Sequence, residues 1–268
     1  MSEEPADDQR VIDLSVEVPG TPGEVWQAIA TGPGITSWFV PHQVEEQEGG
    51  TVRMDFGAGF GEDSARVAAW EPPHRLLMRG DGERALAFEW LVEARDGGTC
   101  LVRLVNSGFG EGEDWDAEYD GMSSGWRIFL QNLRLHLTHF RGQAARAIIP
   151  TRMAGGPFDA AFAKLCGELG VSADLRAGQR FATSGPGVPA LTGTVDGVQE
   201  SPTTRTYFVL LDQPAPGTAF LSAEGTGDIV AISLYLYLYG PDAPALPDEW
   251  TPFLTERFPQ PEAEPAAD

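Results

Sequence analysis

The chain has 268 residues, with 40 acidic and 18 basic side chains and a formal net charge of −22. This excess of carboxylates argues against a nucleic-acid partner, because binding to a phosphate backbone needs clustered lysines and arginines. It argues equally against binding to anionic membrane surfaces. With 42% apolar residues the chain can build a core rather than remain disordered. Its length suits one large or two small domains.

The N-terminal residues and the cysteines indicate the cellular compartment of the protein. The first ten residues carry four acidic side chains, where a secretory signal would carry basic residues followed by an apolar run. No stretch approaches the roughly 18 consecutive apolar residues of a membrane span. Cys100 and Cys166 form neither a C-x-x-C motif nor a metal-binding set, which is typical of reduced thiols. We expect a cytoplasmic protein with disordered tails at 1–10 and 260–268.

The first half of the chain predicts a sheet followed by one long helix. Residues 11–18 alternate between apolar and polar, as in a half-buried strand, and Thr21–Glu24 form a capping box for a short helix. Gly32–Gly34 should end that helix, and 35–40 should form a second one. Strand-like runs separated by turn signals follow up to residue 106, which indicates an antiparallel meander. From 121 to about 148, apolar residues recur every three or four positions, which predicts a long amphipathic helix.

The second half shows a similar order after a linker at 154–157. A helix is predicted over 158–169, with Gly170 as its C-terminal cap. Strands are predicted at 179–183, 190–199, 203–211, 218–223 and 228–239, and a last helix at 248–258. A W-x-x-F-L pattern occurs at 126–130 and again at 250–254. We therefore expect a domain at 11–150 and a smaller α+β domain at 157–259 that is a degenerate second copy of the first.

Six short segments of the first half carry a resemblance to a known family. In chain order they are P-G-E-V-W-Q-A-I at 22–29, T-S-W-F at 36–39, the strand–turn–strand at 66–77 with W-E-P-P inside it, G-G-T-C-L-V at 97–102, S-G-F at 107–109 and G-W at 125–126. Residues 11–149 resemble the SRPBCC (START-like) superfamily. Within it they are most similar to the group related to the activator of the 90-kDa heat-shock-protein ATPase.

The resemblance implies a helix-grip (Bet v-like) fold, in which a curved antiparallel sheet wraps a long C-terminal helix and leaves an apolar cavity. The residue pattern agrees, because a meander with one apolar face and an amphipathic helix must pack face to face. We predict six aromatic residues as ligand-binding walls: Trp38, Phe56, Trp90, Phe109, Trp126 and Phe129. The same residues are equally consistent with an ordinary filled core.

These observations favour a non-enzymatic binding protein for a small hydrophobic or aromatic ligand, with no cofactor. One alternative, suggested by the family name, is a chaperone-ATPase regulator that acts by protein–protein contact. A second is a cyclase or hydrolase working inside the cavity, which would need polar residues that point inward, such as Arg53, Asp55 or Arg103. Neither a catalytic constellation nor a nucleophile motif is evident in the sequence.

Two features resemble metal sites only partly. The acidic run at 111–120 contains D-x-E-x-D-G from Asp116, but the twelfth position is Arg127 rather than the Glu of a calcium loop. His136 and His139 lie three apart on the long predicted helix, and we expect at least one of them to face solvent. We predict no metal site. Gly57–Gly61 lacks the spacing of a dinucleotide fingerprint and is predicted to be a hairpin tip, with a lid at a cavity mouth as the functional alternative.

Overall fold

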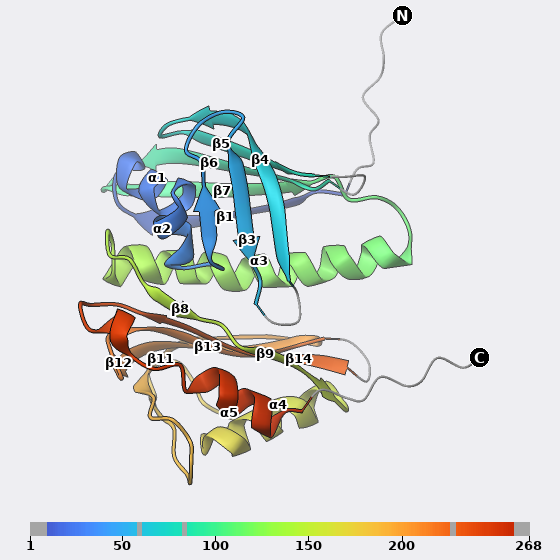
Figure 1. Cartoon of the computed structure of the whole chain (residues 1–268), viewed down its shortest axis with the longest axis vertical. Coiled ribbons are helices and arrows are strands. Elements are labelled where there is room, and N and C mark those ends of the chain that lie inside the picture. Colours follow the sequence, from blue (N-terminus) through green and yellow to red (C-terminus); the bar gives the residue numbers. More distant parts are fainter. Residues whose placement is uncertain (1–9, 58–60, 82–84, 226–228, 260–268) are drawn as a thin grey trace, which may run out of the picture. The chain divides into compact units, whose positions relative to one another are not determined.

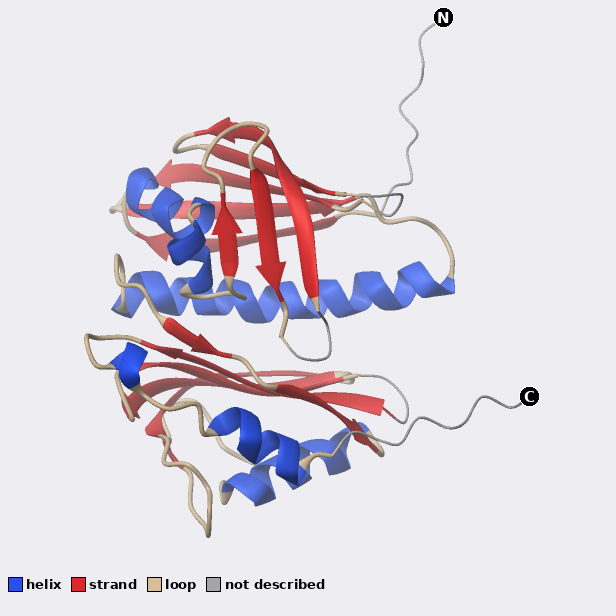
Figure 2. Ribbon diagram, in the orientation of Figure 1, coloured by secondary structure: helices blue, strands red, loops and turns tan. Residues whose placement is uncertain are grey.

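The computed structural model describes residues 10–57, 61–81, 85–225 and 229–259 (Figure 1). The chain divides into two compact units, Met1–Phe56 with Glu62–Ala144 and Gly57–Gly61 with Ala145–Asp268. Each unit contains one antiparallel sheet with helices (Figure 2), so the chain is an α+β protein with two sheet-plus-helix bodies. The predicted disordered tails, apart from Arg10, and the centre of the predicted glycine-rich tip lie outside the described residues.

The first unit consists of a curved sheet and three helices. It opens with strand β1 (Ile12–Pro19) and the short helices α1 (Pro22–Ala30) and α2 (Gly32–Thr36). Six strands follow: β2 (His42–Val44), β3 (Thr51–Asp55), β4 (Glu62–Glu71), β5 (Arg75–Gly80), β6 (Ala87–Arg95) and β7 (Thr99–Ser107). The strand order is β1-β7-β6-β5-β4-β3-β2. The long helix α3 (Glu113–His139) packs against β1 and α1, under the curve of the sheet (Figure 1).

The two short helices are set by local chemistry. In the predicted capping box, the Thr21 backbone N–H donates to Glu24 Oε2 at 2.8 Å, and the Glu24 N–H donates to Thr21 Oγ1 at 3.4 Å. Helix α1 ends just before Gly32–Gly34, as expected, but the second helix spans Gly32–Thr36 rather than the predicted 35–40, and Gly32–Gly34 form its first turn. A Cβ at position 34 would lie 1.9 Å from the Gln27 carbonyl oxygen. Glycine therefore allows α2 to cross close to the end of α1.

Alternation along the strands gives the sheet one apolar face. In β7, Val102 and Leu104 are buried whereas Arg103 between them is exposed. The register pairs Leu104 with Trp90, and Trp90 with Leu76 on the next strand. Residues paired in an antiparallel sheet share a face, so these three side chains continue one apolar surface across three strands.

Helix α3 begins eight residues before the predicted start at 121 and ends at His139 rather than near 148. The acidic residues at its start hide the apolar period, but Trp115 and Tyr119 lie four apart there. Both rings pack on Phe109, with centroids 6.2 Å and 5.2 Å away. These contacts extend the packed face of the helix toward its N-terminus. The acidic side chains there are stabilised by the positive end of the helix dipole.

The second unit begins with two short strands, β8 (Arg146–Ile148) and β9 (Thr151–Gly155), followed by helix α4 (Phe158–Leu169). The remaining elements are β10 (Arg180–Ala182), β11 (Thr192–Ser201), β12 (Thr204–Gln213), β13 (Gly217–Glu224), β14 (Ile229–Leu238), the 3₁₀ turn η1 (Ala243–Ala245) and helix α5 (Trp250–Arg257). The strand order is β10-β11-β12-β13-β14-β8, and β9 also pairs with β14. Helices α4 and α5 lie on the same side of this sheet (Figure 1).

Strands β8 and β9 correct the predicted boundary at 150–157. Residues 146–148 were assigned to the long helix and 154–155 to a linker, yet both segments pair with β14. Pro150 separates the two strands, and its carbonyl oxygen accepts a hydrogen bond from the Leu234 N–H at 3.0 Å. Proline cannot donate to a sheet, so an opening strand that would otherwise be continuous is split in two. The continuous part of the second unit therefore starts at Ala145.

The core of the second unit lies between its sheet and its two helices. Phe162, Phe181 and Phe258 are almost fully buried there. Leu234, Leu236 and Leu238 of β14 belong to the same core. Helix α4 matches its predicted bounds, and Gly170 caps it in the left-handed conformation with φ 65°.

The two units share one order of elements. In each, the opening strand pairs with the last strand, the other strands form a meander, and a helix follows the last strand. The units differ in their final helices, because α3 has 27 residues and α5 has eight.

Candidate functional site

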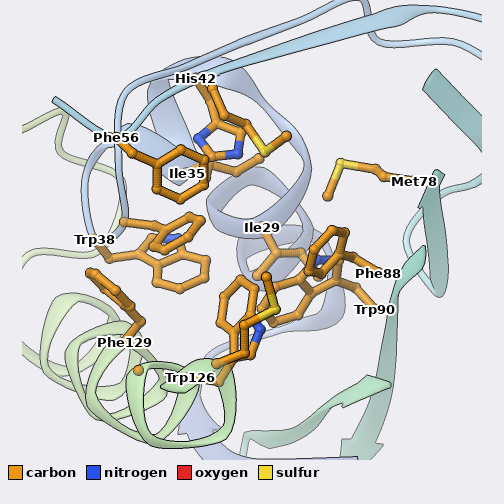
Figure 3. A pocket seen from close by; sticks show the side chains of 14 residues that line it. Ile29, Ile35, Trp38, His42, Phe56, Met78, Phe88, Trp90, Trp126 and Phe129 are labelled. Atoms are coloured by element: carbon orange, nitrogen blue, oxygen red, sulfur yellow. The ribbon is translucent and has the colours of Figure 1, made fainter. Parts of the chain in front are cut away.

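A cavity of about 140 Å³ lies inside the first unit. Figure 3 shows the lining side chains converging on one space from α1, the α2 region, the sheet and α3. They are Ile29, Ile35, Trp38, Phe39, His42, Met54, Phe56, Met78, Phe88, Trp90, Met122, Gly125, Trp126 and Phe129. Almost all of these side chains are apolar, so the cavity offers a ligand dispersion contacts and aromatic faces rather than charges.

Aromatic rings hold one another in place around the cavity. The Trp90 ring lies edge-on to both Trp38 and Trp126, with centroids 5.7 Å and 5.6 Å apart. Phe39 contacts Trp126 at 4.9 Å and Phe129 at 4.5 Å. Three of these four pairs are edge-to-face, all except Phe39 with Trp126, and edge-to-face pairs are favourable beyond the area that they bury. The wall is therefore formed in advance of any ligand.

Hydrogen bonds fix the tryptophan segment between two helices. The Trp38 Nε1–H donates to the Ala28 carbonyl oxygen at 2.8 Å, which ties it to α1. The Asn132 side-chain amide donates to the Trp38 carbonyl oxygen, also at 2.8 Å, which ties it to α3. Both bonds are buried, and a buried bond is costly to lose because its partner is left unsatisfied.

Three methionines line the same space: Met54 from β3, Met78 from β5 and Met122 from α3. Methionine is unbranched and adapts its shape to its surroundings. One part of the wall is therefore rigid and aromatic, and another part can adjust to the outline of a ligand.

Among the lining residues that the structure describes, His42 alone has a titratable side chain. Burial lowers the pKa of its imidazole to about 4, because an apolar environment disfavours the charged form. The imidazole is therefore neutral near pH 7. Its Nδ1 lies 2.7 Å from the Val40 carbonyl oxygen.

Five of the six residues predicted as cavity walls line this cavity: Trp38, Phe56, Trp90, Trp126 and Phe129. Phe109 does not, so its placement at the cavity is a correction. It follows the end of β7 and Gly108, whose φ of 99° turns the chain. Phe109 packs instead on Trp115 and Tyr119 at the start of α3.

Several lining residues were missed by sequence reasoning, although some of them carried a signal. Phe88 and Met54 lie two positions before Trp90 and Phe56, so strand alternation places each pair on one face. Met122 lies four residues before Trp126, on the same helix face. His42 and Gly125 carried no such signal, because only the packed structure shows that they border a space.

The three polar residues named as examples for chemistry in the cavity do not face it. Arg53 and Asp55 are exposed on β3, where they alternate with the buried Val52 and Met54. Arg103 is exposed on β7 and forms an ion pair with Asp13 at 2.5 Å. That arginine lowers the pKa of the Asp13 carboxyl. The three candidates for cavity chemistry thus lie on the face of the sheet opposite Val102 and Leu104.

The predicted features that resemble metal sites do not combine into one. His136 is buried and His139 is exposed, as expected for one of this pair. Burial lowers the pKa of His136 to about 4. In the acidic run, Asp116 forms an ion pair with Arg10. Within the ranges that the structure describes, no group of three or more metal-ligating side chains occurs.

The first unit thus defines a class of protein domain, a sheet-plus-helix body that encloses an apolar cavity. Residues 19–138 match the family model described as "Activator of Hsp90 ATPase homolog 1-like protein". This part of the chain is an AHSA1-like domain of the SRPBCC superfamily, which confirms the resemblance predicted from the sequence. No curated protein matches the chain. No helix in the described ranges is long and apolar enough to cross a membrane.

Solved structures with low sequence identity also resemble the chain. Protein MLL2253 from Mesorhizobium loti is 19% identical with a TM-score of 0.44, and the match covers 49% of this chain and 98% of that one. The Aha1 dimer from Colwellia psychrerythraea is 19% identical with a TM-score of 0.43, covering 50% and 99%. DynU16, from the dynemicin biosynthetic locus, is 18% identical with a TM-score of 0.44, covering 92% and 93%. Similarity of this degree says nothing about a ligand.

Proposed function

We propose that the first unit is a non-enzymatic binding domain whose cavity holds one small aromatic or hydrophobic molecule. The observation that carries this proposal is the space of about 140 Å³ inside a wall of aromatic rings and methionines. A space of that size fits a single ring, since an apolar cavity of about 150 Å³ in another protein binds benzene. Five of the six residues predicted to bind the ligand belong to this proposal, and Phe109 does not.

We propose that the second unit is a degenerate helix-grip copy of the first. The shared order of elements and the W-x-x-F-L pattern in both final helices support this. Both cysteines are buried free thiols, which supports the expected cytoplasmic compartment, where thiols stay reduced.

Gly125 offers a direct test, because it lines the cavity from α3 and a Cβ there would meet no atom within 4 Å. Gly125→Leu adds four carbon atoms to the empty space. Toluene serves as the probe, because it is a single apolar ring. Calorimetry and thermal unfolding of the full chain should show toluene binding and a raised Tm in the wild type. A free toluene concentration one hundred times its Kd should add about 2.7 kcal/mol to the free energy of unfolding.

Gly121→Leu is the matched control, since Gly121 lies one turn earlier on α3, is exposed and also has open space at its Cβ. Both substitutions remove a helix glycine and should raise helix stability by a similar amount. Gly125→Leu should abolish the toluene effect, and Gly121→Leu should keep it. Equal toluene binding by the two variants, or none by the wild type, would contradict the proposal. Native mass spectrometry of gently purified protein offers an independent check for a retained small molecule.

A further inference from the structure

His42 differs from every other residue around the cavity. It opens β2, and its backbone N–H donates to Thr36 Oγ1 at 3.0 Å. Its ring packs against Phe39, with centroids 5.4 Å apart. In Figure 3 the imidazole lies at one edge of the cluster of lining side chains. The imidazole is therefore held in one position beside an apolar space.

The contact to Val40 determines which ring nitrogen carries the proton. A carbonyl oxygen only accepts hydrogen bonds, so the 2.7 Å contact from Nδ1 to the Val40 oxygen requires Nδ1–H. The ring is neutral near pH 7, as its lowered pKa indicates, so it holds that single proton. Nε2 then carries a lone pair. Within the described part of the chain, Nε2 has no hydrogen-bond partner.

We propose that His42 Nε2 is the hydrogen-bond acceptor of the cavity, and that the cavity selects single-ring aromatic molecules carrying one O–H or N–H donor. Phenol is the simplest member of this class. The inference rests on the proposed binding function and specifies its ligand. The Trp38 indole N–H is already used by the Ala28 carbonyl. Trp90 and Trp126 also carry N–H groups, which would recognise an acceptor atom instead.

The expected selectivity follows from what burial does to a hydroxyl group. A hydroxyl that enters an apolar cavity without a partner loses its bonds to water, at a cost of about 1–3 kcal/mol. A partner at Nε2 removes that cost. Loss of the acceptor should therefore weaken phenol binding about tenfold relative to toluene binding, since tenfold corresponds to about 1.4 kcal/mol.

The test compares three probes of one ring each: toluene without a polar atom, anisole with an acceptor only, and phenol with a donor. Dissociation constants are measured by calorimetry for the wild type and for His42→Asn. The asparagine amide nitrogen lies near the position of Nδ1 and can keep the bond to Val40, whereas nothing replaces Nε2. The ratio of phenol to toluene affinity should fall about tenfold in His42→Asn. The ratio of anisole to toluene affinity should not change.

Two further measurements keep the test independent of how well that variant folds. His42→Gln, whose longer amide reaches the position of Nε2, should restore part of the phenol preference. In wild-type protein labelled with ¹⁵N at histidine, phenol should shift the His42 Nε2 resonance and toluene should leave it nearly unchanged.

The two proposals fail in different ways. If none of the three probes binds the wild type, the binding function itself is overturned, and this assignment with it. Suppose instead that toluene binds, that the ratio of phenol to toluene affinity is the same in the wild type and in His42→Asn, and that phenol does not shift the His42 Nε2 resonance. Only the proposed role of His42 is then overturned.

Discussion

The two units build the same order of elements around different interiors. In the first, the sheet and the 27-residue helix α3 enclose a cavity. In the second, the short helices α4 and α5 lie on one side of the sheet, and Phe162, Phe181 and Phe258 fill the space beneath them. The same order of elements therefore surrounds an aromatic-lined apolar cavity in the first unit and a core of large buried side chains in the second. Rings that brace one another, as Trp38, Trp90 and Trp126 do, prevent the wall from collapsing inward.

The largest expected effect distinguishes the filled interior from the hollow one. Phe162 is 1% exposed and lies edge-on to Tyr207 at 5.2 Å. Phe162→Ala should lower the free energy of unfolding by about 3–5 kcal/mol, because it adds a cavity term to the lost transfer energy. Phe129→Ala, at an existing cavity, should lose mainly the transfer term, about 2 kcal/mol. Urea unfolding measures both, and a larger loss for Phe129→Ala would contradict the contrast.

A second prediction concerns pH, since all four histidines lie in the first unit. Burial lowers the pKa of His42 and His136 to about 4, from 6.5. Between these values the unfolded chain binds protons that the folded chain does not, so stability rises with pH. As pH falls from 6.5 to about 4, His42 and His136 should each lower the free energy of unfolding of the first unit by up to about 3 kcal/mol.

Tryptophan fluorescence can follow this loss, because six of the seven tryptophans belong to the first unit. Hydrogen bonds lower the pKa values of Asp13 and Glu24, so their contributions are lost as pH falls through about 3.8 and 4.5, at or beyond the acid end of this window. His42→Asn should make the free energy of unfolding depend less steeply on pH between 4 and 6.5. A stability that stays constant between pH 6.5 and 4 would show that the two histidines are not buried in neutral form.

The smallest effect separates two glycines of the second unit. Gly170 has φ 65°, and a Cβ there would lie 2.1 Å from the Ser184 carbonyl oxygen. Gly170→Ala should therefore destabilise the unit by about 2 kcal/mol. Gly167→Ala, inside the same helix with open space at its Cβ, should stabilise it by about 0.5–1 kcal/mol. Thermal unfolding of the two variants should shift Tm in opposite directions, and shifts of the same sign would exclude this role for Gly170.

Local patterns were sufficient where the chain decides its own conformation. The capping box at Thr21 and helix α4 with its glycine cap both depend on residues close together in sequence. Their hydrogen bonds and side-chain periods are short-range, so the sequence alone predicted them. The six short motifs between residues 22 and 126, which follow one another in the expected order, also sufficed to predict the AHSA1-like domain.

Tertiary structure decided what depends on distant partners. The start of α3 depends on Phe109 packing against Trp115 and Tyr119, and β8 and β9 are strands only because β14 lies beside them. The sequence determined which aromatic residues were candidates for a cavity wall. Only packing decided that Trp38, Trp90 and Trp126 surround a space while Phe109 does not, since side-chain period cannot distinguish a ring that lines a space from one that fills it.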